Sequence, residues 1–512
     1  MEQLRPIFSR EYAAAARVYA LDVALAVLLF VCTSVMTGRI WRFPFDDELI
    51  TLAPIERAHS WLQLLVHYLN AGDIHPPLSF LLFYGLTQAG LSEAQLRLCS
   101  LAMTALALAL FHLLALALAA QRGNEPVSLP TRLIAVLLFG FCALAISQGD
   151  AIRWYPPFTI LIALFVVLYL AGANGAVRLL SAVPLGLAAS TNFLAVLVAA
   201  PFVIYRYWLQ RRFQATYDLA YWLVVGLFSC LGLYSFYSIL AHRLAGVAHT
   251  EFGGGTVRAV MTDMLGFFGG DALGISQSWI IVPVVAISGM AVLSLIDRRQ
   301  PADPIHLLLM MLAASLMFAL IGFGKPRSFL YLSPVLAAVV TLYLNRQATD
   351  RNAASALFLA SLILAASVAS IANINSATHP FKRNAVIPYQ DIVDFIQTNE
   401  TGTTLIVSTD SIIPWVLRHQ YQRDGRCVSY FLSDRCPIAA QRYDSIFVVA
   451  GHSDKSAFAR VMTRFNAALQ SVTADRQKIA TIHVGVDKDA SLKSRLTGVA
   501  LDEYILTVDL YR

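Results

Sequence analysis

Apolar runs long enough to cross a bilayer recur along this chain from residue 19 to residue 373. A helix needs roughly 17 to 25 mostly apolar residues to span about 30 Å of hydrocarbon. Only 14% of the 512 residues are charged, whereas soluble domains carry about 25%. We therefore expect most of the chain to form an α-helical polytopic membrane domain.

The apolar runs predict about eleven transmembrane helices. Their approximate positions are 19–37, 98–120, 132–148, 157–173, 179–191, 193–209, 217–240, 278–296, 306–323, 328–345 and 353–373. Residues 374–512 are of mixed polarity and contain no run of spanning length. The sequence thus divides into a membrane domain over residues 1–373 and a soluble domain over residues 374–512.

The distribution of basic residues predicts the orientation. Arg5, Arg10 and Arg17 precede the first apolar run, which places the N-terminus in the cytoplasm. An odd number of spans then puts the C-terminal domain on the periplasmic side. The remaining basic clusters fall in loops expected to face the cytoplasm: Arg122 and Arg132; Arg206, Arg211 and Arg212; Arg298 and Arg299; Arg346 and Arg351. We expect a multi-pass protein of the bacterial cytoplasmic (inner) membrane.

The first periplasmic loop is long, from residue 38 to residue 96, and we expect it to contain helices that lie along the membrane. Its segment 76–90 is apolar but short, and it opens with two prolines. Such a segment suits an interfacial helix better than a span. Counting it as a span would also place the later basic clusters outside.

The C-terminal domain shows strand patterns that alternate with helical patterns. The expected strands are 404–409, 445–451, 478–486 and 503–512, and the expected helices are 389–398, 412–421 and 456–469. This alternation predicts an α/β domain with a largely parallel sheet. Cys427 and Cys436 lie nine residues apart, so a disulfide between them is plausible in an oxidising compartment.

Three consecutive acids, Asp46, Asp47 and Glu48, follow the first span on the periplasmic side. One interpretation is structural, because an acid before a helix caps it and acids in the first turn suit its dipole. Capping needs one acid, however, and three acids near a bilayer are costly unless they are paired or used. They are therefore the first candidates for catalysis.

Four further motifs follow in order on the same expected face of the membrane. They are Asp73-Ile74-His75-Pro76-Pro77-Leu78, Glu93-Ala94-Gln95-Leu96-Arg97-Leu98, Gln148-Gly149-Asp150-Ala151-Ile152-Arg153-Trp154-Tyr155 and Lys325-Pro326-Arg327-Ser328-Phe329-Leu330-Tyr331. Together with the acids, they resemble the GT-C fold glycosyltransferases, especially the family 39 protein mannosyltransferases and the lipid A aminoarabinose transferases. Each motif is short, and Cys99 stands where the family has proline; the common order and common membrane face carry the resemblance.

The resemblance implies transfer of a sugar from a polyprenyl-phosphate donor, with inversion, to a glycolipid, polysaccharide or protein at the periplasmic face. Such a displacement needs a carboxylate that takes the acceptor's proton. Asp47, the first residue of the family-like acidic pair, is the expected base, with Asp46 as the second candidate. Glu48 would orient the base or help to hold a metal ion.

The departing lipid phosphate needs cations and hydrogen-bond donors, and arginine binds phosphate through two hydrogen bonds at once. The residues that the resemblance assigns to this task are Arg153, Lys325, Arg327, Arg97, Tyr155 and Tyr331. The alternative is that the basic side chains reach lipid headgroups and the tyrosines belong to the interfacial aromatic belt.

Asp73 and His75 are candidates for contacting the acceptor or for fixing their own turn. The sequence requires no cofactor; if a divalent metal ion takes part, Asp47, Glu48 and His75 are the candidate ligands. The glycine-rich segment 250–271 is either a mobile lid or a plain connection.

Other classes of protein fit less well. We find neither a Walker motif nor the basic soluble face of a nucleic-acid-binding protein. A secondary transporter or lipid flippase is the main alternative, but such proteins usually hold ionisable groups near the bilayer midplane and show inverted repeats. Here the acids gather at the outer boundary and no repeat is visible, which favours the enzyme.

Overall fold

The computed structural model describes most of the helical region and part of the C-terminal region. The described residues are 10–37, 40, 46–70, 76–123, 126–171, 175–235, 237, 303–320, 329–347, single positions between 357 and 371, 389–409, 412–419, 421–430, 436, 443–450, 469–470, 473–485 and 505–512. They fall into two compact units, which are described separately. One contains Met1–Ile40 and Thr51–Ala372, and the other Trp41–Ile50 and Asn373–Arg512.

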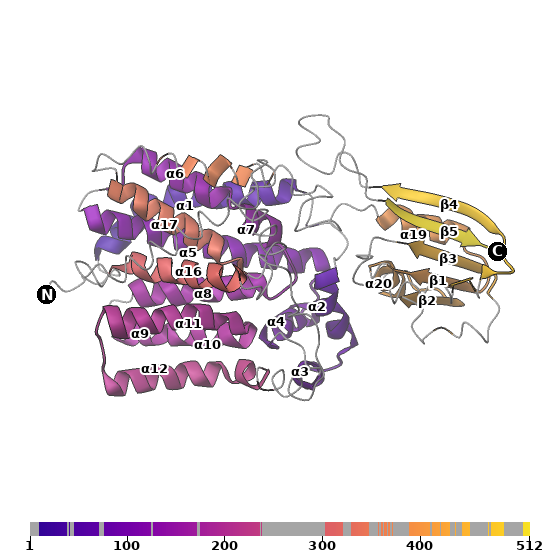
Figure 1. The fold of residues 1–512 in the computed structure, drawn as a ribbon, viewed down its shortest axis with the longest axis horizontal. Helices are drawn as coiled ribbons and strands as arrows, with labels where there is room; N and C mark the ends of the chain where they lie inside the picture. Colours follow the sequence, from indigo (N-terminus) through magenta and orange to yellow (C-terminus); the bar gives the residue numbers. More distant parts are fainter. Residues whose placement is uncertain are drawn as a thin grey trace. The chain divides into compact units, whose positions relative to one another are not determined.

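The first unit is a helical bundle (Figure 1). Its longer helices are α1 (Arg10–Met36), α5 (Glu93–Gly123), α6 (Leu129–Gly140), α8 (Tyr155–Ala171), α10 (Ala182–Thr191), α11 (Val196–Val203), α12 (Ala215–Phe228), α16 (Pro304–Leu320) and α17 (Leu332–Gln347). The short helices α7 (Ala143–Gln148) and α9 (Gly175–Leu180) lie between them in the chain. Helix α5 is the longest of the described helices. It contacts α1, α8 and α17, so it lies at the centre of the described part of the bundle.

Among the described residues, three helical stretches are long and apolar enough to cross a membrane. They are Arg17–Met36, Glu93–Gln121 and Leu129–Gln148. The other apolar helices have 10–17 residues. The expected span 278–296 lies outside the described residues. The spans that lie partly outside them are 157–173, 217–240, 306–323, 328–345 and 353–373.

Three short helices, α2 (Asp46–Arg57), α3 (Trp61–Asn70) and α4 (Leu78–Gln88), come from the first predicted loop. Helices α3 and α4 lie at one end of the bundle (Figure 1) and contact each other. The Trp61 ring meets Tyr84 edge-on at 5.0 Å between centroids. A Cβ atom on Gly85 would come within 2.6 Å of Trp61, so glycine is what lets the indole lie against α4.

The C-terminal unit contains a five-stranded sheet in the order β2-β1-β3-β5-β4. Its strands are β1 (Thr404–Ser408), β2 (Arg426–Tyr430), β3 (Ser445–Ala450), β4 (Lys478–Gly485) and β5 (Ile505–Tyr511). Strand β1 pairs parallel with β2 and β3, whereas β5 pairs antiparallel with both β3 and β4. The expectation of a largely parallel sheet is therefore wrong. The last strand inserts between β3 and β4 and runs against both.

Strand alternation separates the two faces of this sheet. On one face, apolar side chains form a cluster with Cys436 and Tyr443: Leu405, Val407, Ile446 and Val448. On the other face, Phe447 meets Phe395 of helix α19 (Tyr389–Asn399) edge-on at 6.2 Å. Helix α20 (Ile412–His419) contacts β1 and β2. Cys427 of β2 forms a disulfide with Cys436. The expected helix 456–469 lies almost wholly outside the described residues.

Candidate active site

Arg153 lies in the turn between α7 and α8, with only 3% of its surface exposed. Its Nη1 atom donates a hydrogen bond of 3.4 Å to the hydroxyl of Thr51 on α2. The turn is pressed against α5, because the hydroxyl of Thr104 donates to the carbonyl of Gly149 at 3.0 Å. A Cβ atom on Gly149 would come within 2.9 Å of the Thr104 methyl group. The sequence thus folds a cation into a fixed, buried position at the start of α8.

Gln148 ends α7 just before this turn, and Asp150 and Trp154 lie in the turn; all three are buried. Both polar atoms of the Gln148 amide lack a hydrogen bond within the described part of the chain. Buried amides are normally satisfied, so such a group calls for an explanation. The Gln148 amide is therefore a candidate for binding a polar ligand.

Tyr155 and Tyr331 are both buried within the bundle. The Tyr331 hydroxyl shares a 2.5 Å hydrogen bond with Ser315 of α16. Its ring meets Phe158 of α8 at 5.5 Å between centroids, and Tyr155 meets Trp154 at 4.6 Å. These contacts make the two tyrosines part of the packing that supports the turn.

Arg97, one turn after Glu93 at the start of α5, has 1% of its surface exposed. Its Nη1 atom donates to the carbonyl of Ile40 at 3.3 Å, and its Nη2 atom lies 3.6 Å from a carboxylate oxygen of Glu93. The guanidinium therefore joins the chain just after α1 to the start of α5. This arrangement favours an anchoring role for Arg97 over donor binding.

The three acids of the first loop open α2. The helix begins at Asp46, and Glu48 is fully buried. The side chains of Asp46 and Asp47 lie outside the described part of the structure, as do residues Asp73, His75, Lys325 and Arg327. The roles expected for these six residues stay predictions.

Glu56, in the last turn of α2, was not among the predicted site residues. Desolvation and the nearby negative charge of Glu93 raise its pKa to about 7, although Arg57 acts in the opposite direction. A carboxyl group with a pKa near the working pH is suited to exchange protons with a substrate. Glu56 is therefore a further candidate base beside Asp47 and Asp46.

Sequence reasoning also missed Thr51 and gave Gln148 no role. Thr51 is 102 residues from the arginine that it binds, and no local pattern indicates such a contact. Gln148 was visible as the first residue of a family-like motif, but only the packing shows that its amide has no hydrogen bond among the described residues.

The described residues give no support for a metal centre. In the described part of the chain, no group of three or more His, Cys, Asp or Glu side chains is arranged to hold a metal ion. Of the three candidate ligands, only Glu48 has a described side chain. The metal ligands expected from the sequence, Asp47, Glu48 and His75, stay predictions.

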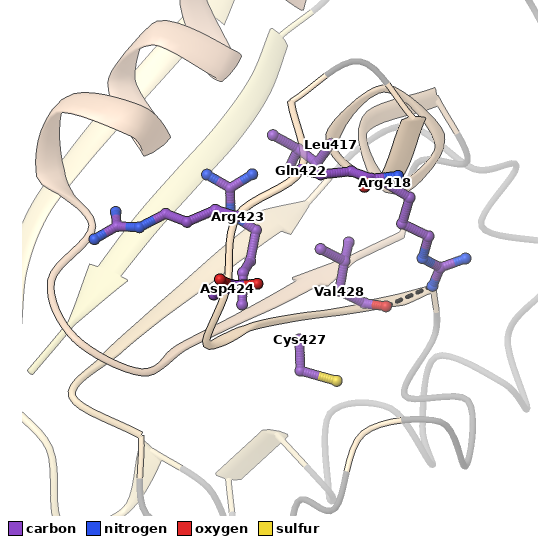
Figure 2. A pocket seen from close by; sticks show the side chains of 8 residues that line it. Leu417, Arg418, Gln422, Arg423, Asp424, Cys427 and Val428 are labelled. Carbon is purple, nitrogen blue, oxygen red and sulfur yellow. Dashed lines mark hydrogen bonds between the residues drawn. The ribbon is translucent and has the colours of Figure 1, made fainter.

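The C-terminal unit has a shallow cavity of about 490 Å³ beside β2 (Figure 2). It is lined by Leu417, Arg418, Gln422, Arg423, Asp424, Arg426, Cys427 and Val428. Its arginines already have protein partners. Arg423 and Arg426 pair with Glu400, and Arg418 donates to the carbonyl of Val428 at 2.5 Å. Because these arginines are already paired, the lining residues do not identify a ligand for the cavity.

Comparison with known proteins gives a fold but no close relative. No protein-family model matches the chain, and no curated protein matches it in sequence. Among solved structures, ArnT from Cupriavidus metallidurans in the apo state matches 97% of this chain and 98% of its own, with a TM-score of 0.50 and 12% identity. The chain therefore has a GT-C-like fold.

Two further structures match over most of the chain. ArnT from Cupriavidus metallidurans bound to undecaprenyl phosphate has a TM-score of 0.46, with 14% identity over 96% of this chain and 98% of that one. The Archaeoglobus fulgidus oligosaccharyltransferase in complex with Zn and sulfate has a TM-score of 0.44, with 12% identity over 93% of this chain and 76% of that one.

Proposed function

We propose that this protein is a membrane glycosyltransferase that moves a sugar from a polyprenyl-phosphate donor to an acceptor at the periplasmic face. The observation that carries the proposal is the position of Arg153. It is buried in the turn before α8 and bound to Thr51 of α2. An inverting displacement needs such a cation for the departing phosphate and a carboxylate for the acceptor's proton.

In the proposed reaction, a carboxylate takes the proton of the acceptor hydroxyl while the acceptor oxygen attacks the anomeric carbon. The bond from that carbon to the lipid phosphate breaks, and both of its electrons leave with the phosphate. Arg153 stabilises the growing negative charge there, and the amide of Gln148 donates to the same group or to the sugar. Asp47 is the proposed base, with Asp46 and Glu56 as competing candidates.

The proposed partners are a polyprenyl-phosphate sugar, the bilayer, and an acceptor that is a glycolipid, a polysaccharide or a protein. Lys325 and Arg327 are proposed to complete the phosphate site, and Asp73 and His75 to contact the acceptor or hold its loop. The C-terminal domain is proposed to lie in the periplasm with the catalytic loops.

A panel of radiolabelled polyprenyl-phosphate sugars, offered to the purified protein with an envelope extract, tests this proposal. Wild-type protein is compared with Asp47→Asn, Asp46→Asn and Glu56→Gln. Transfer by the wild type, lost only in Asp47→Asn, supports the function and the proposed base. Loss only in Glu56→Gln would move the base to Glu56. If no donor supports transfer, the glycosyltransferase proposal is rejected, and the alternative of a transporter or flippase is tested next.

A further inference from the structure

The connection between α11 and α12 has an unusual backbone. Helix α11 continues into a π-helical turn, η3 (Ile204–Leu209), before the chain reaches α12. Within this connection, Arg211 adopts a left-handed conformation with φ of 50°. By the charge-based topology, this end of the bundle faces the cytoplasm, away from the proposed active site.

A buried ion pair fixes this connection. The Nε and Nη2 atoms of Arg206 donate to one carboxylate oxygen of Asp218, at 2.8 and 2.5 Å. The other oxygen of Asp218 accepts from the backbone of Gln214 at 2.8 Å. The Arg206 guanidinium also lies over the Tyr217 ring, 4.9 Å from its centre. Asp218 is therefore fully engaged and neutralises Arg206.

Three other arginines gather at this connection. Arg178 of α9 and Arg212 lie close enough to the Tyr169 hydroxyl for their charges to act on it, and Arg211 precedes Arg212. Arg211 and Arg212 are exposed. Asp218 is the only acidic residue in the sequence from 169 to 222, and Arg206 already balances it. Within this stretch of sequence, positive charge therefore exceeds negative charge.

Two large aromatic side chains flank the exposed arginines. Trp208 is 73% exposed and Phe213 is 74% exposed. The ring of Phe213 lies 6.3 Å from that of Tyr207, and Tyr207 in turn accepts a hydrogen bond from Trp222 at 2.9 Å. Exposed aromatic rings at the level of lipid headgroups anchor a protein in the membrane interface. The same short segment thus offers cations for a phosphate and rings for the acyl boundary.

We propose that Arg178, Arg211 and Arg212, with Trp208 and Phe213, form a binding site for the phosphodiester headgroup of an anionic phospholipid of the inner leaflet. The excess of positive charge complements the lipid phosphate, and arginine binds it through paired hydrogen bonds. The rings hold the acyl chains beside the connection. This site is independent of the sugar-transfer reaction and lies at the opposite expected face.

The test counts phosphatidylglycerol molecules that remain on the full-length protein after extraction from mixed phosphatidylglycerol and phosphatidylethanolamine nanodiscs, by native mass spectrometry. Each arginine near an anionic surface is worth about fivefold in affinity, so Arg211→Gln with Arg212→Gln should weaken retention by about 25-fold. Trp208→Ala with Phe213→Ala should also reduce it. Melting curves check that the variants fold, as expected for exposed positions.

Arg17→Gln is the matched control, because Arg17 is also exposed and lies on the same expected face. Retention unchanged in this variant supports a specific site, whereas a loss of about fivefold in Arg17→Gln, the same per arginine as in the double variant, would show diffuse surface charge and overturn the proposal. Full retention by the Arg211 and Arg212 variant would overturn it too. A polyprenyl phosphate is added in a separate arm; its replacement of phosphatidylglycerol at this patch would assign the patch to the lipid carrier instead.

Discussion

The guanidinium of Arg153 binds the hydroxyl of Thr51, 102 residues earlier in the chain, at 3.4 Å. The contact joins the turn before α8 to α2, the helix that opens with the three acids. The donor phosphate and the catalytic acid of the proposed reaction would depend on these two elements. Their connection gives the proposal its most direct mutational tests.

Replacing Arg153 should impair the departure of the lipid phosphate. Removing one group that stabilises transition-state charge typically lowers kcat by about 10²- to 10³-fold, and we expect this for Arg153→Gln. Arg153→Lys should keep part of the activity, since it retains charge without the planar fork. The activity of both variants is measured as the steady-state transfer rate with one fixed donor. Activity near that of the wild type in Arg153→Gln would exclude the residue from the site.

Thr51 should act by positioning Arg153. Loss of one hydrogen bond is worth about 1 kcal/mol, so Thr51→Ala should reduce transfer by about fivefold. Thr51→Ser keeps the hydroxyl and should retain activity. A double-mutant cycle with Arg153→Gln measures the coupling. If the effects of the two substitutions simply multiply, the contact has no part in the reaction.

Glu56 should make stability depend on pH. Its pKa is about 7 in the folded protein against 4.5 for the free side chain. As pH rises from 4.5 to 7, the unfolded chain loses this proton while the folded chain keeps it, so the contribution of Glu56 to stability falls. Glu56→Gln should therefore raise the melting temperature at pH 8 and leave it nearly unchanged at pH 4.5. An equal shift at both pH values would contradict the raised pKa.

The disulfide between Cys427 and Cys436 provides a test of orientation. Disulfides persist in the periplasm and are rare in the cytoplasm. In intact cells, these two cysteines should resist a maleimide label until a reductant is added. Cys427→Ser should also lower the stability of the C-terminal domain by about 2 to 4 kcal/mol, whereas Cys32→Ser, at an exposed free cysteine, should not. Free thiols at both positions in cells would contradict a periplasmic tail.

Gly402 should be needed for the turn before β1. It has a φ of +53°, and a Cβ atom there would come within 2.1 Å of a carboxylate oxygen of Asp444. That oxygen accepts from the backbone of Thr403 at 2.7 Å, and this bond lowers the pKa of Asp444. Gly402→Ala should destabilise the sheet by about 1 to 3 kcal/mol.

Gly425→Ala is the matched control for this position. Gly425 also has positive φ, of +76°, but its nearest neighbour would lie 3.6 Å from an added Cβ atom. Hydrogen exchange at β1 and β3 in the full-length protein compares the two. Equal protection losses would show that backbone conformation alone matters and that the contact with Asp444 does not.

Patterns that depend on local periodicity were visible in the sequence. The strands over β1, β3, β4 and β5 follow from runs of β-branched and apolar residues. Strand β2, Arg-Cys-Val-Ser-Tyr, was missed because its pairing with β1 rather than its composition makes it a strand. The antiparallel insertion of β5 was missed for a related reason: strand direction is decided by neighbours far apart in the chain.

In the candidate site too, some features could be predicted from the sequence and others depend on packing. Motif order pointed to Arg153 and Tyr155, but the polar contacts of Arg97 with Ile40 and of Tyr331 with Ser315 come from packing between distant segments. Nothing in the sequence around Glu56 indicates that Glu93, the charge that helps to raise its pKa, lies nearby. Chemistry could thus be assigned to segments, whereas the division between binding and supporting residues needed the fold.

The most direct test of the account is a mass balance with a doubly labelled donor in proteoliposomes that contain the purified protein and an acceptor. The proposed reaction predicts one molecule of free polyprenyl phosphate for each new glycosidic bond, with both products lost in Asp47→Asn. Donor that crosses the membrane with its sugar still attached, and no glycosylated acceptor, would contradict the account and identify a flippase.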